Sequence, residues 1–422
     1  MILAVVLFAT TTWAADHETV LHSFNFTDGW MPAGGLIFDT AGNLYGTTSA
    51  GGVHDNGTVF ELAPREGGGW IETVLHSFGH GTDGNGPGGD LIFDAAGNLY
   101  GTTYGGGINP CEGFGCGTVF ELSPRQGGGW TEEVLHSFNG TGGQYPYAGL
   151  VFDAAGNLYG TTSKGGIQGA GTIFELSPRQ GGGWTERVLH SFGNGTDGAE
   201  PRAGLILDGA GNLYGTTVSG GIHLDQCGVG CGTVFQLSPQ QGGGWTETLL
   251  HSFSYDGTDG VEPFGGLVFD AAGNLYGTTF GGGIHATCYQ GGRCGTVFEL
   301  SPRQGGGWTE TVLHSFDGTD GYQPNSAPLI DGTRNLFGMT QNGGIHPCFG
   351  AGCGTVFELS PRQGGGWIET VLHSFNNSPD GYIPEADLVF DGAGNLYGTT
   401  LEGGIHTTCF GTTCGAVFKI AP

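Results

Sequence analysis

The chain has 422 residues, of which 91 are glycine, 37% are hydrophobic and 11% are aromatic. The glycines follow no three-residue period, which excludes a collagen, and the apolar content excludes a disordered chain. With 39 acidic residues against 11 basic ones, the net charge is −28, so phosphate backbones and anionic lipid surfaces would repel the protein. We therefore expect neither nucleic-acid binding nor membrane insertion.

The first residues, 1–14, form an apolar run that ends in small residues (MILAVVLFATTTWA). A signal-peptidase cut before Ala15 fits this pattern, although no basic residue precedes the run, and the run is too short to span a bilayer. We predict a signal peptide over 1–14, with a truncated basic region, and a single domain over 15–422. An ordinary buried segment is the alternative interpretation of the run.

Three phrases recur along the rest of the chain, which indicates seven consecutive units. The phrase D-x-A-G-N-L-Y-G-T-T, degenerate in its sixth copy, begins at Asp39, Asp94, Asp153, Asp208, Asp270, Asp331 and Asp391. The phrase L-H-S-F occurs seven times and G-G-G-W six times.

Each unit predicts four short strands, as at residues 266–269, 275–279, 296–300 and 308–316. These runs are rich in β-branched and aromatic residues, are bounded by Gly, Pro, Asn and Asp, and show no helical period. Four strands repeated seven times predict an all-β fold, namely a seven-bladed β-propeller with four antiparallel strands in each blade.

The two ends of the chain support a closed ring. The domain opens with a lone fourth strand at residues 18–24 and finishes with a third strand at 416–420. Pairing of the two would complete the last blade and cover two exposed sheet edges. We therefore predict that an N-terminal outer strand completes the C-terminal blade.

The ten cysteines form five close pairs with none left over: Cys111 with Cys116, Cys227 with Cys231, Cys288 with Cys294, Cys348 with Cys353, and Cys409 with Cys414. Behind a leader peptide, even and local pairing predicts disulfides and a secreted, extracellular or periplasmic location. Each bridge would close a short loop and contribute only about 2 kcal/mol. Zinc held by two thiolates and a G-G-I-H histidine such as His223 would lack a fourth ligand, so we predict no metal there.

The unit G-x-L-x-F-D-x-A-G-N-L-Y-G-T-T, followed by G-T-V-F-E-L, closely resembles the GloVer-type tandem repeat of secreted bacterial proteins. The resemblance covers nearly the whole chain after the leader. It implies an extracellular repeat protein of unassigned activity and supplies no catalytic residues.

Strand order assigns the loops to two rims. The turns between first and second strands and between third and fourth strands lie on one rim, and they are nearly identical from unit to unit. The opposite rim carries the length variation and the cysteines, so we expect binding there.

The L-H-S-F histidines do not predict a shared metal site. Equivalent positions in neighbouring blades are at least about 10 Å apart, whereas metal ligands must converge on one ion. We predict a hydrogen-bonded histidine between blades, and tryptophans of G-G-G-W that pack in the core or between blades.

Aspartates also recur in the N-G-T-D-G loops, at Asp83, Asp197, Asp259 and Asp320, with variants at Asp28 and Asp380. Such residues usually bond their own loop backbone. We predict no cofactor, with weak calcium binding by these loops as the alternative.

Residues that break the repeat near the channel mouth are the predicted ligand-binding residues. Aromatic rings cover the apolar face of a sugar, while carboxylates and amides bond its hydroxyl groups. The set comprises Trp30, Asp90, Tyr145, Tyr147, Arg202, Glu262, Phe264, Tyr322, Tyr382 and Asp387. An ordinary polar rim with scattered aromatics is the plain alternative.

The leading hypothesis is a secreted, non-catalytic binding or scaffold protein whose disulfide-bearing rim recognises a glycan or another extracellular component. The second is a polysaccharide-active enzyme that uses two of Glu200, Glu262 and Glu385 as acid and base, because glycosidases need carboxylates about 5 to 10 Å apart. A third is a structural protein that self-associates through its uniform rim.

Overall fold

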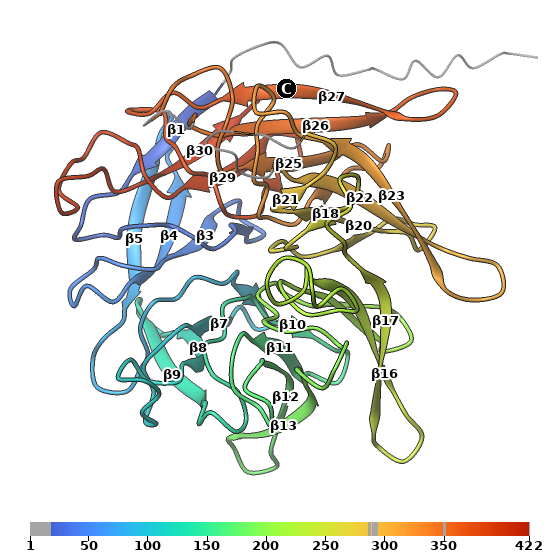
Figure 1. The fold of residues 1–422 in the computed structure, drawn as a ribbon. Helices are drawn as coiled ribbons and strands as arrows, with labels where there is room; N and C mark the ends of the chain where they lie inside the picture. Colours follow the sequence, from blue (N-terminus) through green and yellow to red (C-terminus); the bar gives the residue numbers. More distant parts are fainter. Residues whose placement is uncertain (1–17, 286–287, 289–293, 349–351, 422) are drawn as a thin grey trace, which may run out of the picture.

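A computed structural model describes residues 18–285, 288, 294–348 and 352–421, so the predicted signal peptide lies outside the described residues. Within these ranges the regular structure consists of β-strands, arranged as seven four-stranded antiparallel sheets around a common axis (Figure 1). The predicted seven-bladed propeller is confirmed.

The strands follow the chain from the axis outwards in every blade but the last. Blade 1 holds β2 (Ile37–Phe38), β3 (Leu44–Thr48), β4 (Thr58–Pro64) and β5 (Trp70–Ser77), and blade 2 holds β6 (Ile92–Phe93), β7 (Leu99–Thr103), β8 (Thr118–Pro124) and β9 (Trp130–Ser137). Blade 3 holds β10 (Val151–Phe152), β11 (Leu158–Thr162), β12 (Thr172–Pro178) and β13 (Trp184–Ser191), and blade 4 holds β14 (Ile206–Leu207), β15 (Leu213–Thr217), β16 (Thr233–Pro239) and β17 (Trp245–Ser252). Blade 5 holds β19 (Val268–Phe269), β20 (Leu275–Thr279), β22 (Thr296–Pro302) and β23 (Trp308–Ser315), and blade 6 holds β24 (Leu329–Ile330), β25 (Leu336–Thr340), β26 (Thr355–Pro361) and β27 (Trp367–Ser374). Two further short strands, β18 (Gly260–Val261) and β21 (Gly281–Gly282), form an antiparallel pair of their own. Strand β18 precedes β19, and β21 lies between β20 and β22.

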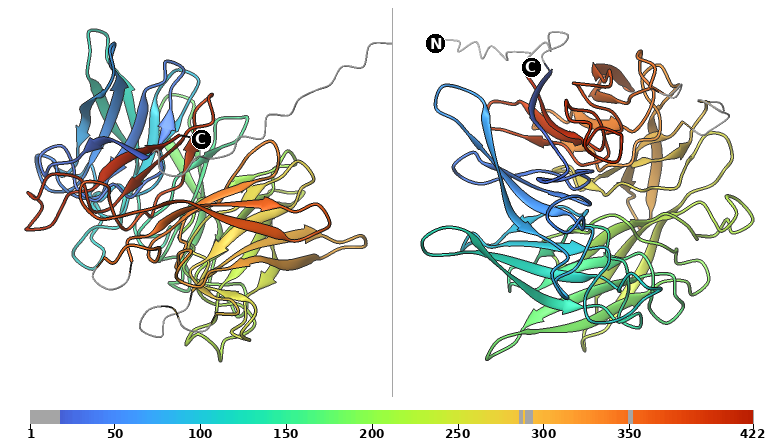
Figure 2. Two further views of the ribbon diagram at one scale, coloured as in Figure 1. Left: turned by 90° about the horizontal axis from the view of Figure 1, so that it is seen from above. Right: turned by 90° about the vertical axis from the view of Figure 1, so that its left-hand side faces the viewer.

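Blade 7 is shared between the two ends of the chain. Its inner strands are β28 (Val389–Phe390), β29 (Leu396–Thr400) and β30 (Ala416–Ile420), and its outer strand is β1 (Glu18–Ser23). Strands β1 and β30 are antiparallel, with Glu18 opposite Ile420 and Ser23 opposite Ala416, and Figure 2 shows the blue first strand against the red last blade. The predicted ring closure is confirmed.

The innermost strands are shorter than predicted, two residues in place of the four at 266–269. At six of the blades, the backbone carbonyl before the inner strand accepts a hydrogen bond from a neighbouring blade. Thr278 Oγ1, for example, donates to the carbonyl of Ser326 at 2.8 Å. We call the contact between two neighbouring blades a seam. At six of the seven seams in the described chain a threonine makes this bond: Thr47, Thr102, Thr161, Thr216, Thr278 and Thr399.

The turn after each inner strand explains the D-x-A-G-N-L-Y phrase. In blade 3, Asp153 Oδ1 accepts hydrogen bonds from the backbone N–H groups of Ala155 and Asn157. Its Oδ2 accepts from the Asn157 amide and from the Tyr159 hydroxyl, at 2.8 and 3.1 Å. Gly156 has φ +83°, which a side chain would strain. One carboxylate therefore organises the whole turn.

Aromatic side chains join the blades. Each phenylalanine of L-H-S-F is fully buried and meets a phenylalanine of the next blade, as Phe24 meets Phe60 edge to face at 5.0 Å between ring centroids. The tryptophan that opens an outer strand packs against a tyrosine of another blade, as Trp130 does against Tyr45 at 6.4 Å. The predicted packing of these tryptophans between blades is confirmed.

All five predicted disulfides are present, each between cysteines four to six residues apart. The bonds join Cys111 to Cys116, Cys227 to Cys231, Cys288 to Cys294, Cys348 to Cys353, and Cys409 to Cys414. Five disulfides and no free cysteine among the described residues fit an oxidising environment. In the described part of the chain, no helix has the length and apolarity needed to cross a bilayer.

The disulfides are more deeply placed than a rim position suggests. The second cysteine of every pair has 0% of its surface exposed, and each belongs to an apolar cluster between blades: Cys116, Cys231, Cys294, Cys353 and Cys414. Each bridge therefore attaches a rim loop to the core beneath it.

Candidate ligand-binding site at the channel mouth

A ring of seven side-chain positions surrounds the mouth of the central channel. Each is the residue directly after the proline that precedes an inner strand: Ala33, Gly88, Tyr147, Arg202, Phe264, Asn325 and Glu385. Together with residues above them they line a cavity of about 740 Å³.

The backbone explains why these positions, and not their neighbours, line the mouth. The residue before each proline has a positive φ, close to 60° at Tyr145, Glu200 and Glu262. This conformation is rare for residues with a side chain and persists only where surrounding contacts hold it. Tyr145 is buried, whereas Tyr147, two residues later, lines the cavity.

A second tier of the cavity comes from the residues that follow the second strands. Tyr104 follows β7, Phe280 follows β20, and Gln341 follows β25. The ring centroids of Tyr104 and Tyr147 are 4.9 Å apart, and those of Phe264 and Phe280 are 5.1 Å apart. Blades 2, 3 and 5 thus present a wall of aromatic rings.

Arg202 lies between the two aromatic pairs. Its guanidinium carbon is 5.7 Å from the Tyr147 ring centroid and 5.2 Å from that of Phe264, within cation–π range. Its Nη2 lies 3.3 Å from Glu200, while its Nε is buried without a hydrogen-bond partner among the described residues. The planar cation is therefore fixed in place with one donor unused.

The opposite side of the mouth, from blades 6 and 7, is polar except for Leu401. The Gln341 side-chain amide donates to Glu385 Oε1, and burial raises the pKa of Glu385. Asn325 Oδ1 is buried and has no hydrogen-bond partner within the described chain. Such a buried polar atom normally has a partner, so it is available to a ligand.

Two more carboxylates lie deeper in the channel, among the inner strands. Asp90 Oδ1 accepts from the Gly35 N–H at 2.5 Å, and Asp387 Oδ1 accepts from the Ala327 N–H at 2.7 Å. Burial raises the pKa of both, and the negative charge of Asp90 raises that of Asp387 further. Each side chain nevertheless keeps some surface open to the channel, so both carboxyl groups can be reached from it.

The predicted site residues therefore fall into three groups. Tyr147, Arg202, Phe264 and Glu385 line the mouth, and Asp90 and Asp387 lie in the channel beneath it. Tyr145, Tyr322 and Tyr382 are buried, Trp30 is half-buried against a core cluster, and Glu200 pairs with Lys164 and Arg202. Glu262 is absent from the lining of both cavities, and its N–H bonds the carbonyl of Cys231.

The cysteines lie outside the lining of the cavity at the channel mouth. The cavity opens on the disulfide-bearing rim, where Phe114 of the Cys111–Cys116 loop is one of its lining residues, although none of the ten cysteines lines the mouth or the channel beneath it. Cys116, Cys294, Cys353 and Cys414 are fully buried, because their disulfides pack between the blades. The bridges can therefore shape the rim loops but cannot contact a ligand in the cavity.

Sequence reasoning missed Tyr104, Phe280, Gln341 and Asn325. The first three occupy one position, directly after the second strand, where the other units carry Ser49, Ser163, Val218 and Leu401. This variable residue at the end of an otherwise constant phrase was the signal that could have identified them.

The L-H-S-F histidines are engaged at the outer part of the blades. Nε2 of His76, His190, His251, His314 and His373 is hydrogen-bonded to a loop aspartate, at 2.8 to 3.2 Å. The prediction of hydrogen-bonded histidines is confirmed at these five. The third unit has Gly142 in place of the aspartate, and there His136 lies 4.0 Å from Glu186 of the next blade.

A family model described as the Gloeobacter/Verrucomicrobia repeat matches residues 5–229 and 225–422. The chain belongs to this repeat family. No functionally curated protein matches this Gloeobacter/Verrucomicrobia repeat protein.

Solved structures with a similar fold have little sequence in common with this Gloeobacter/Verrucomicrobia repeat protein. An ancestral GH74 enzyme matches with a TM-score of 0.56 and 11% identity over 94% of this chain, which spans only 48% of that enzyme. A polysaccharide lyase, the PL25 ulvan lyase, matches with a TM-score of 0.58 and 12% identity over 93% of this chain and 94% of the lyase. The same lyase bound to -[GlcA(1-4)Rha3S]- gives a TM-score of 0.57 at 11% identity, with the same coverage. At these identities the likeness is one of fold.

Proposed function

We propose that this repeat protein is an exported, non-catalytic glycan-binding protein, and that the glycan binds at the channel mouth. The observation that carries the proposal is the division of the mouth into two unlike halves. Tyr104, Tyr147, Phe264 and Phe280 form an aromatic wall, and Asn325, Gln341 and Glu385 form a polar wall across from it.

A sugar ring has the same two-sided chemistry. Its C–H face packs on aromatic rings, while its hydroxyl groups donate to and accept from amides and carboxylates. The cavity, at about 740 Å³, falls within the range of small-molecule sites and suits a short stretch of a polysaccharide.

Two further observations support the proposal. The buried, unpartnered Arg202 Nε and Asn325 Oδ1 supply a donor and an acceptor that a polyhydroxylated ligand would satisfy. The ulvan lyase, which this chain matches over nearly its whole length, has been solved with the saccharide -[GlcA(1-4)Rha3S]- bound.

Replacing Tyr147 or Phe280 with Ala is expected to weaken glycan binding by about tenfold each, because each loses one stacking surface of roughly 1 to 1.5 kcal/mol. A glycan array with the wild-type protein identifies the ligand, and isothermal titration calorimetry measures the affinity of the variants. Tyr255→Ala is the matched control, since this exposed tyrosine lies on a loop of the same rim and does not line the cavity.

The proposal fails if no glycan binds at millimolar concentration, or if Tyr147→Ala and Phe280→Ala bind as tightly as Tyr255→Ala. A glycan that binds equally well to all variants would place its site elsewhere on the protein.

The channel carboxylates favour a second candidate, a polysaccharide-cleaving enzyme. The raised pKa values of Glu385, Asp90 and Asp387 would keep one carboxyl protonated as an acid near a second that acts as base. Asp387→Asn should then abolish release of reducing ends from the bound polysaccharide, while Asp380→Asn, on an outer loop, should not. Binding without any release by the wild-type protein would leave the non-catalytic proposal standing and remove the enzyme.

A further inference from the structure

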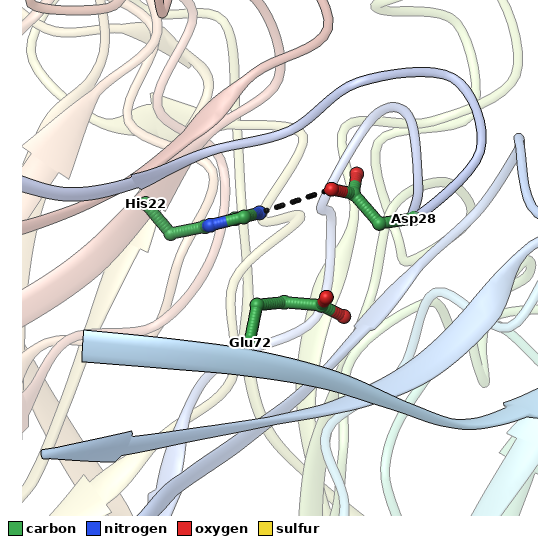
Figure 3. A group of neighbouring side chains, drawn as sticks. All are labelled: His22, Asp28 and Glu72. Atoms are coloured by element: carbon green, nitrogen blue, oxygen red, sulfur yellow. Dashed lines mark ion pairs between the residues drawn. The ribbon is translucent and has the colours of Figure 1, made fainter.

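Three ligand-type side chains converge where the closing strand meets blade 1. His22 lies on β1, Asp28 on the loop after it, and Glu72 on β5, and Figure 3 shows the three groups facing one another. One nitrogen and two carboxylate oxygens, one atom from each residue, all lie within 4.8 Å of one another.

Two of these atoms are buried without a partner. His22 Nε2 and Glu72 Oε1 are almost completely inaccessible to solvent, and neither has a hydrogen bond among the described residues. The nearest group to His22 Nε2 is Asp28 Oδ2 at 3.4 Å, an ion-pair distance that lacks hydrogen-bond geometry. Asp28 is itself held in position by the Asn25 N–H, which donates to its Oδ1 at 2.7 Å.

The other seams differ from this one in a way that matters for metal binding. At five of them the histidine Nε2 is occupied by its aspartate, as in His314–Asp320 at 2.8 Å. At the seam between blades 2 and 3, Gly142 replaces the aspartate, so one ligand is missing. Only the first cluster, within the described chain, combines all three ligand types with an unbonded imidazole nitrogen.

We propose that His22, Asp28 and Glu72 bind one divalent transition-metal ion, for which zinc is the probe. An imidazole nitrogen with two carboxylate oxygens is a ligand set that zinc accepts, whereas calcium prefers six to eight oxygens. Three protein ligands leave a fourth position for water. The ion would neutralise the paired carboxylates and tie β1, the strand that closes the ring, to blade 1.

The test is zinc binding to the full-length protein after chelator treatment, at pH 8, followed by isothermal titration calorimetry and thermal unfolding. We expect one strong site, and a rise in Tm of about 3 °C at a zinc concentration a hundredfold above Kd. Glu72→Gln and His22→Gln should each weaken binding by more than about tenfold, since even groups that only support a metal ligand have effects of that size.

Glu132→Gln is the matched control, because Glu132 occupies the equivalent position in the next blade, where His76 is hydrogen-bonded to Asp83. His54→Ala controls for adventitious binding at the surface pair His54 and His80, whose rings are 6.2 Å apart. Both controls should keep the strong site. The proposal is overturned if folded wild-type protein shows no strong site, or if the site survives Glu72→Gln or is lost in His54→Ala. Circular dichroism of each variant confirms that the propeller is folded.

Discussion

Replacing Phe24 with Ala is expected to lower the free energy of unfolding by about 3 to 5 kcal/mol, the range for truncating a buried phenylalanine. Phe24 follows the closing strand β1, has 0% of its surface exposed, and packs against Phe60 of blade 1. The cavity would open at the seam where the two ends of the chain complete the ring. Urea denaturation followed by circular dichroism measures the loss.

Phe410→Ala is the surface control, because 73% of Phe410 is exposed, and it should cost less than about 1 kcal/mol. Phe192→Ala truncates an equally buried phenylalanine at an interior seam. A Phe24→Ala variant as stable as Phe410→Ala would show that the closing seam contributes little to the stability of the ring. Equal losses at Phe24 and Phe192 would show that this seam is as strong as the seams within the continuous chain.

Raising the pH from about 5 to about 8 is expected to lower Tm by roughly 5 °C. Burial raises the pKa of one glutamate at each of four seams to about 7: Glu132, Glu247, Glu310 and Glu369. It also raises the pKa of Glu186 at a fifth. The folded protein holds these protons more tightly than the unfolded chain, whose glutamate pKa is 4.5. Their stabilisation is therefore complete below pH 4.5 and is lost as the pH rises through about 7.

The size of this effect follows from partial burial. Allowing for solvent screening, each glutamate contributes on the order of 1 kcal/mol, and several together give a shift of several degrees in a chain of this length. Burial lowers the pKa of His136 to about 4 and also lowers that of His190, so these two oppose the trend below pH 6.5. Differential scanning calorimetry across this pH range measures the sum.

The neighbouring residues Glu132 and Glu133 provide a matched pair for this prediction. Glu132 lies between blades, whereas Glu133 is exposed on the other face of β9. Glu132→Gln should reduce the pH dependence of Tm, and Glu133→Gln should leave it unchanged. A Tm that stays constant across this pH range, or equal slopes in the two variants, would contradict the assignment.

The fold was predictable because the same strand and turn residues recur in every unit. Asp153 and Trp130 have equivalents in other units because each blade needs the same turn and the same contact with its neighbour. The incomplete units at 18–24 and 416–420 indicated ring closure. The length of the inner strands was not predictable. Bonds such as that from Thr278 to Ser326 run between blades, and nothing local in the sequence shows where they form.

The candidate site could be predicted only in part. Repeat-breaking residues around each proline identified a segment that lines the cavity. Within it, however, Tyr145 and Tyr147 are only two positions apart, and Tyr145 is buried whereas Tyr147 lines the cavity. The backbone of Tyr145 has a positive φ, which accounts for the different directions of the two side chains. The sequence does not reveal this conformation, because tyrosine rarely adopts it. The aromatic wall also depends on Tyr104 and Phe280, which come from a different part of the unit and meet the first set only in the folded ring.

Met339 has a consequence for how such a ring can be rearranged. It occupies the position at which the other six blades carry a threonine, whose hydroxyl donates to the carbonyl before the next inner strand. Between blades 6 and 7, Asp387 accepts a hydrogen bond from the Ala327 N–H, and Gln341 donates one to Glu385. Units joined by the threonine bond share one kind of connection, so exchange of one such unit for another would conserve that bond. Because Asp90 makes the same bond to the Gly35 N–H between blades 1 and 2, the Gln341–Glu385 pair is what distinguishes the junction of blades 6 and 7, and exchange of either blade alone would break that pair.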